Sequence, residues 1–405
     1  MRDEREMKDS NIPWIEKIPC NWKVRRGKTI LTLLKRPVLE EDGVVTCFRD
    51  GEVTLRSNRR EDGFTNSLKE IGYQGVEPGD FVVHGMDGFA GAIGISDSRG
   101  KMSPIINVMD STENKKYLTY YMRAMANLDV FLSLSTGIRE RSCDLRWNKI
   151  ADFSFILPSL TEQKSIADYL DYYCSKIDTI IAEAKASIEE YKELKQAVIY
   201  EAVTKGLDKN AKLVNCKVNS LNKMPETWRI VPVKYLCSMQ AGKNLISEQI
   251  ADTGIYHVYG GNGLRGYYES YNTEGHRLLI GRQGALCGNI HEVNGKYWCT
   301  EHALVTTVKP IVDTHYLYYL FSAMNLNQYA SNAAAQPGLA ASNILNLRTI
   351  IPSLDMQKNI SRCLDEKVSQ LDSLINEKQA LIEDLESYKK SLIYEVVTGK
   401  RKVVA

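Results

Sequence analysis

Residues 156–164 read ILPSLTEQK, and residues 350–358 read IIPSLDMQK. The same spacing of 194 residues relates IEEYKELKQAVIYEAVT at 188–204 to IEDLESYKKSLIYEVVT at 382–398. The two copies align without a gap over roughly 45 residues, including Asp178 with Asp372, which chance does not produce. The chain therefore contains an internal duplication.

The duplication extends to the front of each copy at a different spacing. IPCNWKV at 18–24 matches MPETWRI at 224–230, 206 residues later, so the second copy is about 12 residues shorter in its middle. Fainter matches lie between these anchors: Tyr117-Leu118 with Tyr316-Leu317, and Gly85 and Gly88 with Gly281 and Gly284. We therefore divide the chain into a variable unit at 1–156, a similar segment at 157–206, a second variable unit at 207–351 and a second similar segment at 352–405.

The similar segments have the pattern of long helices. Neither Gly nor Pro occurs between Ser159 and Lys205 or between Ser353 and Thr398, and apolar residues recur every seven positions. Those of the first segment are Leu170, Ile177, Ala184, Tyr191 and Val198, flanked by Ile166, Ile181 and Ile188. Those of the second are Leu364, Leu371, Leu385 and Leu392, flanked by Ile360, Ile375 and Ile382, with Lys378 as an interruption. Sustained heptads predict two helices of roughly 60 Å with a coiled-coil seam.

The ends of both helices carry recognisable signals. Ser159 with Glu162 predicts a capping box at the first start, and Gly206 and Gly399 predict the two ends. A lone amphipathic helix would expose its seam, so we expect the two copies to pair with each other. The pairing is antiparallel if a pseudo-two-fold axis relates the halves.

The variable units have a different sequence pattern. Short β-rich runs, such as VVTCFRDGEVTLRS, DFVVHG, IYHVYG and RLLIG, are separated by turn residues. YLTYYMRAM and YLYYLFSAM predict one short buried helix in each unit. The fold class is therefore α+β: two globular domains that alternate with two long helices paired as an antiparallel coiled coil. The sequence leaves the strand order open.

Composition excludes several classes of protein. Of the 405 residues, 43% are hydrophobic and 25% charged, as in soluble globular proteins, and no apolar run is long enough for a membrane span. The charged N-terminus lacks the apolar core of a secretory signal. Nine scattered cysteines without a C-x-x-C favour free thiols in the cytoplasm over disulfides or a metal site.

Charge is unevenly distributed along the chain. Residues 157–205 and 353–398 each hold six basic and nine acidic residues, so the rest of the chain is positive against a net charge of +2. A positive excess in the variable units permits a nucleic-acid partner, although solvated surface explains it equally well.

One motif suggests an enzyme. Gly261, Gly263 and Gly266 form a G-x-G-x-x-G within YGGNGLRGYY at 259–268, the spacing of a dinucleotide-binding turn. Such a turn must open a helix, whereas GYYESYN follows, so a hairpin or loop is favoured. The sequence contains no phosphate loop, no H-E-x-x-H and no pair of adjacent prolines such as a DNA amino-methyltransferase requires. We therefore expect a non-catalytic chain.

Two variable units that alternate with similar helices, each opening at Pro-x-x-x-x-Gln-Lys, resemble the specificity (S) subunit of type I restriction–modification systems. IPWIEKIPCNWKVRR, LPSLTEQKSIADYLD with its copy IPSLDMQKNISRCLD, and the IYEAVTKG and IYEVVTGK helix ends carry the resemblance over nearly the whole chain. YGGNGLRGYY with LLIGRQGALCG resembles the body of a target-recognition domain. Met356 departs from the pattern, because the first copy has Glu162 there.

The resemblance implies a subunit that binds double-stranded DNA and tells other subunits where to act. Each recognition domain would read one half of a bipartite, asymmetric target, and the helices would set the gap and dock two modification (methyltransferase) subunits. Restriction subunits would add translocation and cleavage. S-adenosylmethionine, ATP and Mg²⁺ are expected on these partners, and no cofactor or membrane is expected for this chain.

Base readout favours Arg for guanine and Asn or Gln for adenine, while phosphates attract Lys and Arg. The candidate DNA-binding residues of the second domain are Asn262, Arg265, Arg282, Gln283 and Gln336, and those of the first are Arg56, Arg59, Arg60, Arg139 and Arg141. Met86-Asp87 stands where Arg282-Gln283 stands in the second copy, as different half-sites would require.

Three other interpretations stay open at this point. In the first, the chain is a structural coiled-coil tether of two interaction domains. In the second, it is a nucleotide-dependent enzyme built on the glycine motif. In the third, it is a specificity subunit that serves a methyltransferase without a nuclease.

Overall fold

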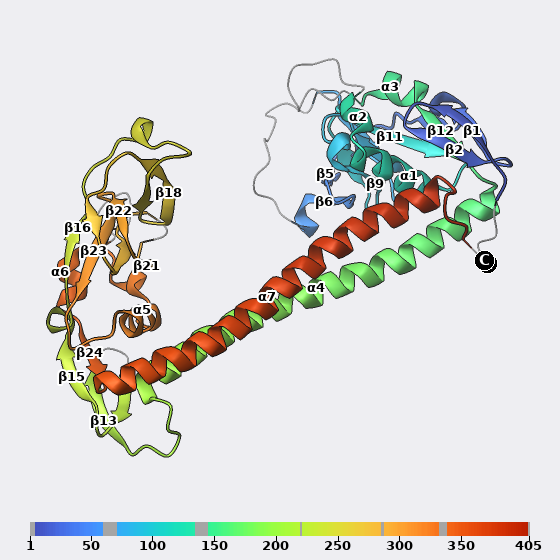
Figure 1. Ribbon diagram of the computed structural model, residues 1–405. Helices are drawn as coiled ribbons and strands as arrows, with labels where there is room; N and C mark the ends of the chain where they lie inside the picture. Colours follow the sequence, from blue (N-terminus) through green and yellow to red (C-terminus); the bar gives the residue numbers. More distant parts are fainter. Residues whose placement is uncertain are drawn as a thin grey trace. The chain divides into compact units, whose positions relative to one another are not determined.

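The computed structural model of the protein describes residues 5–59, 71–133, 145–218, 221–284, 287–331 and 338–403. The chain forms two compact units: unit 1 contains residues 1–184 and 380–405, and unit 2 contains residues 185–379. Two long helices, α4 (Leu160–Lys205) and α7 (Leu354–Val397), each contribute to both units. Each unit therefore combines a globular domain with part of both long helices (Figure 1).

Unit 1 is centred on a four-stranded antiparallel sheet of order β4-β11-β8-β9. These strands are β4 (Leu31–Leu33), β11 (Ile106–Ser111), β8 (Phe81–His84) and β9 (Ile93–Ile95). Antiparallel pairs surround it: β1 (Met7–Ile12) with β2 (Ile15–Pro19), β3 (Lys23–Arg26) with β12 (Ser154–Leu157), β5 (Val45–Cys47) with β6 (Val53–Leu55), and β7 (Gln74–Val76) with β10 (Gly100–Met102). Its short helices are α1 (Lys115–Asn127), α2 (Val130–Ser133) and α3 (Trp147–Asp152).

Unit 2 repeats this plan. Its antiparallel sheet has the order β16-β23-β20-β21, from β16 (Cys237–Ala241), β23 (Ala303–Val308), β20 (Arg277–Gly281) and β21 (Ile290–Val293). The pairs β13 (Leu213–Val218) with β14 (Leu221–Pro225) and β15 (Arg229–Pro232) with β24 (Arg348–Ile351) also recur. Its short helices are α5 (Thr314–Ala323) and α6 (Ala341–Leu345). A second sheet, β18-β17-β22-β19, has no four-stranded counterpart among the described residues of unit 1; its strands are β17 (Tyr256–Gly260), β18 (Gly263–Tyr268), β19 (Thr273–Glu274) and β22 (Lys296–Cys299).

The element bounds follow the duplication closely. Strands β1, β2 and β3 match β13, β14 and β15 at a shift of 206 residues, while β12 and the start of α4 match β24 and the start of α7 at 194. The difference arises in the middle of each unit, where unit 1 has the two-stranded pairs β5–β6 and β7–β10 and unit 2 has the sheet that contains β17 and β18. The two copies therefore share a frame, made of the matching outer strands and long helices, and differ in the strands that lie between them.

The Gln of each Pro-x-x-x-x-Gln-Lys connects a long helix to a short one, α4 to α1 in unit 1 and α7 to α5 in unit 2. Gln163 is fully buried; its side chain accepts from the Asn114 N–H at 2.9 Å and donates to the Pro158 carbonyl at 3.0 Å. Gln357 accepts from the Asp313 N–H at 2.9 Å and donates to the Pro352 carbonyl at 3.1 Å. Asn114 and Asp313 are the N-caps of α1 and α5. A buried amide is retained only when hydrogen-bonded, so these bonds explain the repeated motif.

Both long helices pair in antiparallel fashion within each unit. In unit 1, Lys389 of α7 donates to Asp178 of α4 at 2.6 Å, and in unit 2, Lys195 of α4 donates to Asp372 of α7 at 2.7 Å. These pairs are equivalent, because a shift of 194 residues converts one into the other. Further along unit 2, Val203 of α4 shares a core with Ile360 and Leu364 of α7, which fixes the opposite directions of the two helices.

The predicted heptad seam is buried at most of its positions and half-buried at the others, which are Tyr191, Val198, Leu371, Ile375 and Leu385. Ile166, Leu170, Ile177, Ile181, Ala184 and Ile188 of α4 are buried, as are Ile360, Leu364, Ile382 and Leu392 of α7. A fully buried Leu or Ile stabilises the fold by roughly 1.5–3 kcal/mol relative to exposure. Burial of the seam is therefore the main reason why these helices stay paired.

The predicted capping box forms only in part. Ser159 Oγ accepts from the Glu162 N–H at 3.2 Å, but the Glu162 carboxylate does not cap the helix. It accepts from Trp22 Nε1 at 3.0 Å and pairs with Arg5 at 2.5 Å. The prediction for Glu162 is wrong in this respect, because a buried indole N–H and a nearby guanidinium compete successfully for the carboxylate.

The helix ends are as predicted. Gly206 and Gly399 both have the left-handed backbone expected after a helix, with φ of 82° and 75°. Gly206 packs on Trp228, whereas a Cβ on Gly399 would lie 2.4 Å from Pro19 and 3.2 Å from Trp22. Each front motif with its tryptophan therefore closes over the end of a long helix.

Candidate nucleic-acid interface

The glycine motif of unit 2 forms a hairpin, which agrees with the predicted alternative to a dinucleotide turn. β17 and β18 are antiparallel, and Asn262 lies in the turn between Gly260 and Gly263. Gly263 has a φ of 92°, and Gly266 follows a shift in register between the two strands. No helix follows to receive a pyrophosphate, since β18 continues to Tyr268.

The hairpin turn packs against the end of β20. A Cβ on Gly261 would lie 2.8 Å from the His302 carbonyl oxygen and 3.6 Å from the Gly281 Cα. Asn289 Nδ2 donates to Asn262 Oδ1 at 3.3 Å. The turn that carries Asn262 therefore lies beside the two residues that follow Gly281, which are Arg282 and Gln283.

Arg282 and Gln283 are held from both sides. The Arg282 N–H donates to the His302 carbonyl at 3.0 Å, and the Arg282 carbonyl accepts from the Leu339 N–H at 2.8 Å. His302 Nδ1 donates to Gln283 Oε1 at 2.6 Å, while Gln283 itself is exposed. Arg282 Nε is buried without a hydrogen-bond partner among the described residues. The guanidinium thus retains donor capacity that its own fold does not use.

Arg265 lies on the same hairpin and is exposed. Its side chain covers Gly260, where a Cβ would meet the Arg265 Cδ at 2.6 Å, and its Nη2 lies 3.4 Å from Ser247 Oγ. The structure thus places four candidates on two neighbouring segments of unit 2 and adds Asn289 and His302. We call Asn262, Arg265, Arg282, Gln283, Asn289 and His302 the unit 2 polar patch.

Sequence reasoning missed Asn289 and His302. Both lie at strand ends, Asn289 directly before β21 and His302 directly before β23, and these strands flank β20 in the sheet. The strand order that brings them to Gln283 is not readable from the sequence. The only sequence signal was their position in turn-rich segments close to strands.

Unit 1 has different chemistry at the matched position. Met86 is 44% exposed, and Asp87 accepts from Arg49 at 2.9 Å. The N–H groups of Met86 and Asp87 both donate to His84 Nδ1, and burial lowers the pKa of His84, which favours the neutral acceptor. The position that offers Arg and Gln in unit 2 therefore offers a thioether and a carboxylate in unit 1.

The two described candidate arginines of unit 1 make contacts within the domain. Arg59 donates to Asp50 at 3.0 Å and to Glu52 at 2.9 Å, and its guanidinium lies 4.2 Å from the centre of the Phe48 ring. Arg56 Nε donates to Thr46 Oγ1 at 2.9 Å, and burial lowers the pKa of Arg56. Because two carboxylates neutralise Arg59, its attraction for a phosphate is weaker than that of an isolated guanidinium.

Four candidates lie outside the described residues: Arg60, Arg139, Arg141 and Gln336. The residues that flank two of these segments are described and bond to neighbouring positions of the alignment, one residue apart. The Leu145 N–H donates to the Gly85 carbonyl in unit 1, and the Leu339 N–H donates to the Arg282 carbonyl in unit 2. Gly338 also bridges to Gln283 and Ser331.

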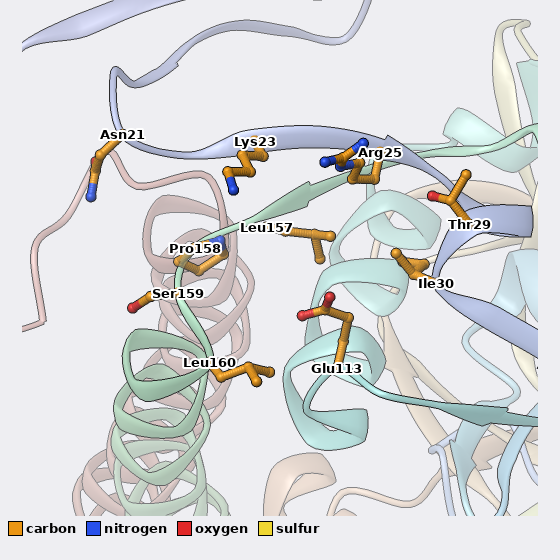
Figure 2. A pocket seen from close by; sticks show the side chains of 10 residues that line it. All are labelled: Asn21, Lys23, Arg25, Thr29, Ile30, Glu113, Leu157, Pro158, Ser159 and Leu160. Atoms are coloured by element: carbon orange, nitrogen blue, oxygen red, sulfur yellow. The ribbon is translucent and has the colours of Figure 1, made fainter.

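A pocket of about 560 Å³ lies at the start of α4 in unit 1. Figure 2 shows Lys23 and Arg25 on β3 at one side and Glu113 on the other, with Pro158 and Ser159 between the strand and the helix. None of the candidate DNA-binding residues lines it. Among the described residues, no group of three or more His, Cys, Asp or Glu could hold a metal ion, and no helix has the length and apolarity needed to cross a bilayer.

Comparison with known proteins finds similarity to one family. Residues 225–384 match the family of the type I restriction modification DNA specificity domain. The chain is 42% identical over 135 residues to the type I restriction enzyme EcoprrI specificity subunit of Escherichia coli, a match that covers 32% of this chain and 33% of that protein. It is 22% identical over 441 residues to a putative type I restriction enzyme MjaX specificity subunit of Methanocaldococcus jannaschii, with 96% of both chains covered. The chain is thus similar to type I restriction–modification specificity subunits, in one segment at 42% identity and over nearly its full length at 22%.

Coverage of the relatives is uneven. The matches span 33% of the Escherichia coli protein and 62% of a second specificity subunit, MjaVIII of Methanocaldococcus jannaschii, which is 24% identical over 276 residues. The family assignment therefore rests on segments of some relatives and on nearly the full length of another.

Solved structures from type I R-M systems share the fold. A chain from a study of complex assembly and conformational transition of the type I R-M system superposes with a TM-score of 0.73 at 12% identity, covering 95% of this chain and 99% of that one. The HsdS subunit from Thermoanaerobacter tengcongensis gives a TM-score of 0.53 at 13% identity, covering 95% and 98%. At these identities the likeness shows the fold alone: two globular domains with two long helices.

Proposed function

We propose that this specificity subunit binds double-stranded DNA and that each of its two globular domains reads one half of a bipartite, asymmetric target. The observation that carries the proposal is the duplication of one frame with unlike chemistry at a matched position. Arg282 and Gln283 follow the central strand β20, whereas Met86 and Asp87 follow its counterpart β8. Unlike side chains on equivalent frames suit unlike half-sites.

The unit 2 polar patch has the donors and acceptors that base edges require. Arg recognises guanine through two hydrogen bonds, and the amide of Gln or Asn recognises adenine. The bond from His302 to Gln283 restricts the amide before DNA arrives, which lowers the entropic cost of binding. Asn262, on the adjoining turn, supports readout of a neighbouring base pair.

The two long helices act as the spacer and as the docking surface of the modification subunits. Beside the buried seam, exposed apolar residues recur every seven positions on α7, and they follow the same spacing on α4 with an interruption at Ser187. In unit 1 these are Tyr173 and Ile180 of α4 with Leu381 and Tyr388 of α7; in unit 2 they are Leu194 of α4 and Leu374 of α7. We call this set the exposed stripe. Exposed apolar residues in a regular row favour a protein partner over solvent.

The chain itself contributes recognition, and the chemistry belongs to its partners. Methyl transfer and its S-adenosylmethionine, and the ATP and Mg²⁺ of restriction, are assigned to the modification and restriction subunits. The described residues offer no metal-binding group, and the hairpin at Gly261–Gly266 leaves no nucleotide turn. The proposed location is the cytoplasm, where cellular DNA and these partners are found.

The decisive experiment maps the methylated bases in DNA modified by this chain together with the methyltransferase subunit encoded beside it. We expect one bipartite sequence with two unlike halves and a fixed gap. Methylation without any sequence preference, or with preference for a single continuous half, would overturn the proposal in favour of a tether without DNA readout.

A further inference from the structure

In each unit, three polar side chains connect a short helix to a long helix: α1 to α4 in unit 1, and α5 to α7 in unit 2. In unit 1, Asp171 of α4 accepts from Lys116 at 2.5 Å and from the Tyr120 hydroxyl at 2.8 Å, both on α1. In unit 2, Asp365 of α7 accepts from His315 Nε2 at 2.5 Å and from the Tyr319 hydroxyl at 2.8 Å, both on α5. We call these sets the unit 1 triad and the unit 2 triad.

The triads occupy equivalent positions in the duplication. Asp365 follows Asp171 by 194 residues, the spacing of the long helices. His315 and Tyr319 follow Lys116 and Tyr120 by 199 residues, the spacing that also relates Tyr316 to Tyr117. Cation and phenol are four residues apart on one helix face in both units, so both reach the same carboxylate. The same contact thus recurs in two domains whose middle parts differ.

The triads are notable for the geometry that they impose and not for the stability that they contribute. The Lys116 and Asp171 side chains are 57% and 37% exposed, and an exposed ion pair by itself contributes little to stability. The tyrosine hydroxyls differ from this exposed ion pair, because burial raises the pKa of Tyr120 and of Tyr319 and keeps each hydroxyl a hydrogen-bond donor. A hydroxyl and a cation on one carboxylate fix direction as well as distance.

The two triads differ in their cation, and unit 2 extends its network into the sheet. His315 Nδ1 also donates to Glu292 of β21, which accepts from His276 Nε2 at 2.6 Å. The bond to Glu292 and, to a smaller extent, the bond to Asp365 together raise the pKa of His315 to about 9, against the opposing effect of burial. Tyr318 stacks on the imidazole, with ring centres 5.8 Å apart. His315 is thus the cation of a chain from sheet to short helix to long helix.

We propose that the two triads fix the angle of each recognition domain on its long helix and thereby restrict the gap that the protein accepts between half-sites. The inference rests on the proposed function. The triad residues are positioning residues, because none of them belongs to the unit 2 polar patch or to the matched segment at Met86. Loosening a triad lets a domain reach half-sites at neighbouring gaps while it reads the same bases.

The two triads respond differently to pH. A His whose pKa is raised from 6.5 to about 9 in the folded protein contributes stability that is fully present below about pH 6.5. That stability is lost as the pH rises through about 9. Lys116 stays charged over this range, and the Asp171 carboxylate raises its pKa. Unit 2, and not unit 1, therefore relaxes as the pH rises from 6.5 to 9.

The test uses the full chain with its methyltransferase subunit and a DNA library in which the gap between the mapped half-sites varies by single base pairs. The wild type is expected to methylate one gap strongly. Asp171→Asn and Asp365→Asn are expected to raise methylation at gaps one base pair longer or shorter by about tenfold relative to the native gap, with both half-sites unchanged. Glu366→Gln, an exposed neighbour of Asp365, serves as the matched control and is expected to behave as wild type.

Two further variants separate positioning from folding. His315→Lys gives unit 2 the cation of unit 1; it is expected to keep the gap preference and to lose the pH dependence that wild type shows between pH 6.5 and 9. Tyr319→Phe removes only a hydroxyl and carries the test if Asp365→Asn does not fold. Variants that melt at lower temperature but keep the wild-type gap preference would overturn the role of the triads. A wild type without any gap preference would instead overturn the proposed function, and the role of the triads with it.

Discussion

Gln163 and Gln357 show what single residues do in this fold. Each side chain lies inside the protein, accepts from the N-cap residue of a short helix and donates to the carbonyl of the proline five residues before it. Glu162, one residue before Gln163, binds Trp22 instead of capping its helix. Met356 takes its place in the second copy and has no carboxylate to offer. The two copies therefore agree at the buried amide and differ at the neighbouring residue.

Gln163→Ala is expected to lower the free energy of unfolding by about 1–3 kcal/mol, because it leaves the Asn114 N–H and the Pro158 carbonyl without their partner. Calorimetric melting of the full chain measures the effect. Gln196→Ala, at an exposed position of the same helix, is the control and is expected to change stability little. Equal melting temperatures for the two variants would contradict the structural role of Gln163.

Changing Arg282 and Gln283 together to Ala is expected to alter or abolish recognition of one half-site while the other half is still required. Each lost base contact costs about 1–3 kcal/mol of discrimination. Sequencing of methylated DNA reports the outcome directly. Arg59→Ala is the comparison variant, and we expect a smaller effect from it, because Asp50 and Glu52 already neutralise Arg59. Undiminished methylation of the original full site would remove Arg282 and Gln283 from the candidates.

The long helices behave as one element at the next scale. Their seam is buried, and the equivalent ion pairs Asp178–Lys389 and Lys195–Asp372 fix the register in each unit. Seventeen residues separate Asp178 from Lys195 on α4, and the same number separate Asp372 from Lys389 on α7. Equal deletions within these intervals therefore leave both ion pairs intact.

Deletion of residues 183–189 together with 378–384 removes one heptad from each helix. It shortens the pair by about 10 Å at 1.5 Å per residue, which corresponds to about three base pairs of DNA. We expect both half-sites to be kept and the methylated gap to shorten accordingly. Deletion of 183–189 alone is the control; it breaks the register and is expected to impair assembly. An unchanged gap after the double deletion would argue against the spacer role.

At the scale of the whole molecule, two kinds of surface are distributed over each unit. The globular domains present polar side chains at strand ends, and the long helices present the exposed stripe. The buried seam and the exposed stripe share a period of seven residues, so one helix serves two contacts. This division matches a protein that binds DNA with its domains and other subunits with its helices.

Ile180→Asp combined with Leu374→Asp is expected to abolish co-purification of the modification subunit, because each places a charge within the apolar contact. The melting temperature is expected to stay close to wild type, since the two side chains are 44% and 38% exposed. Thr179→Asp, at the adjacent exposed position of α4, is expected to leave co-purification intact. Retention of the partner by the double variant would place the docking surface elsewhere.

The sequence by itself determined the duplication, the two long helices with their seam and terminal glycines, the helices at YLTYYMRAM and YLYYLFSAM, and the absence of a helix after the glycine motif at Gly261–Gly266, which it left as a hairpin or a loop. These features depend on local conformation and on periodicity, which neighbouring residues specify. The family resemblance followed from the same order of segments.

Only the tertiary structure decided which distant side chains meet. The partner of Glu162, the approach of His302 and Asn289 to the hairpin turn, and the two triads all join residues that are well separated in the chain. Such contacts depend on strand order and on the packing of the short helices against the long ones. The sequence positions of two side chains do not reveal such a contact, because the tertiary arrangement that brings the partners together depends on the whole sequence.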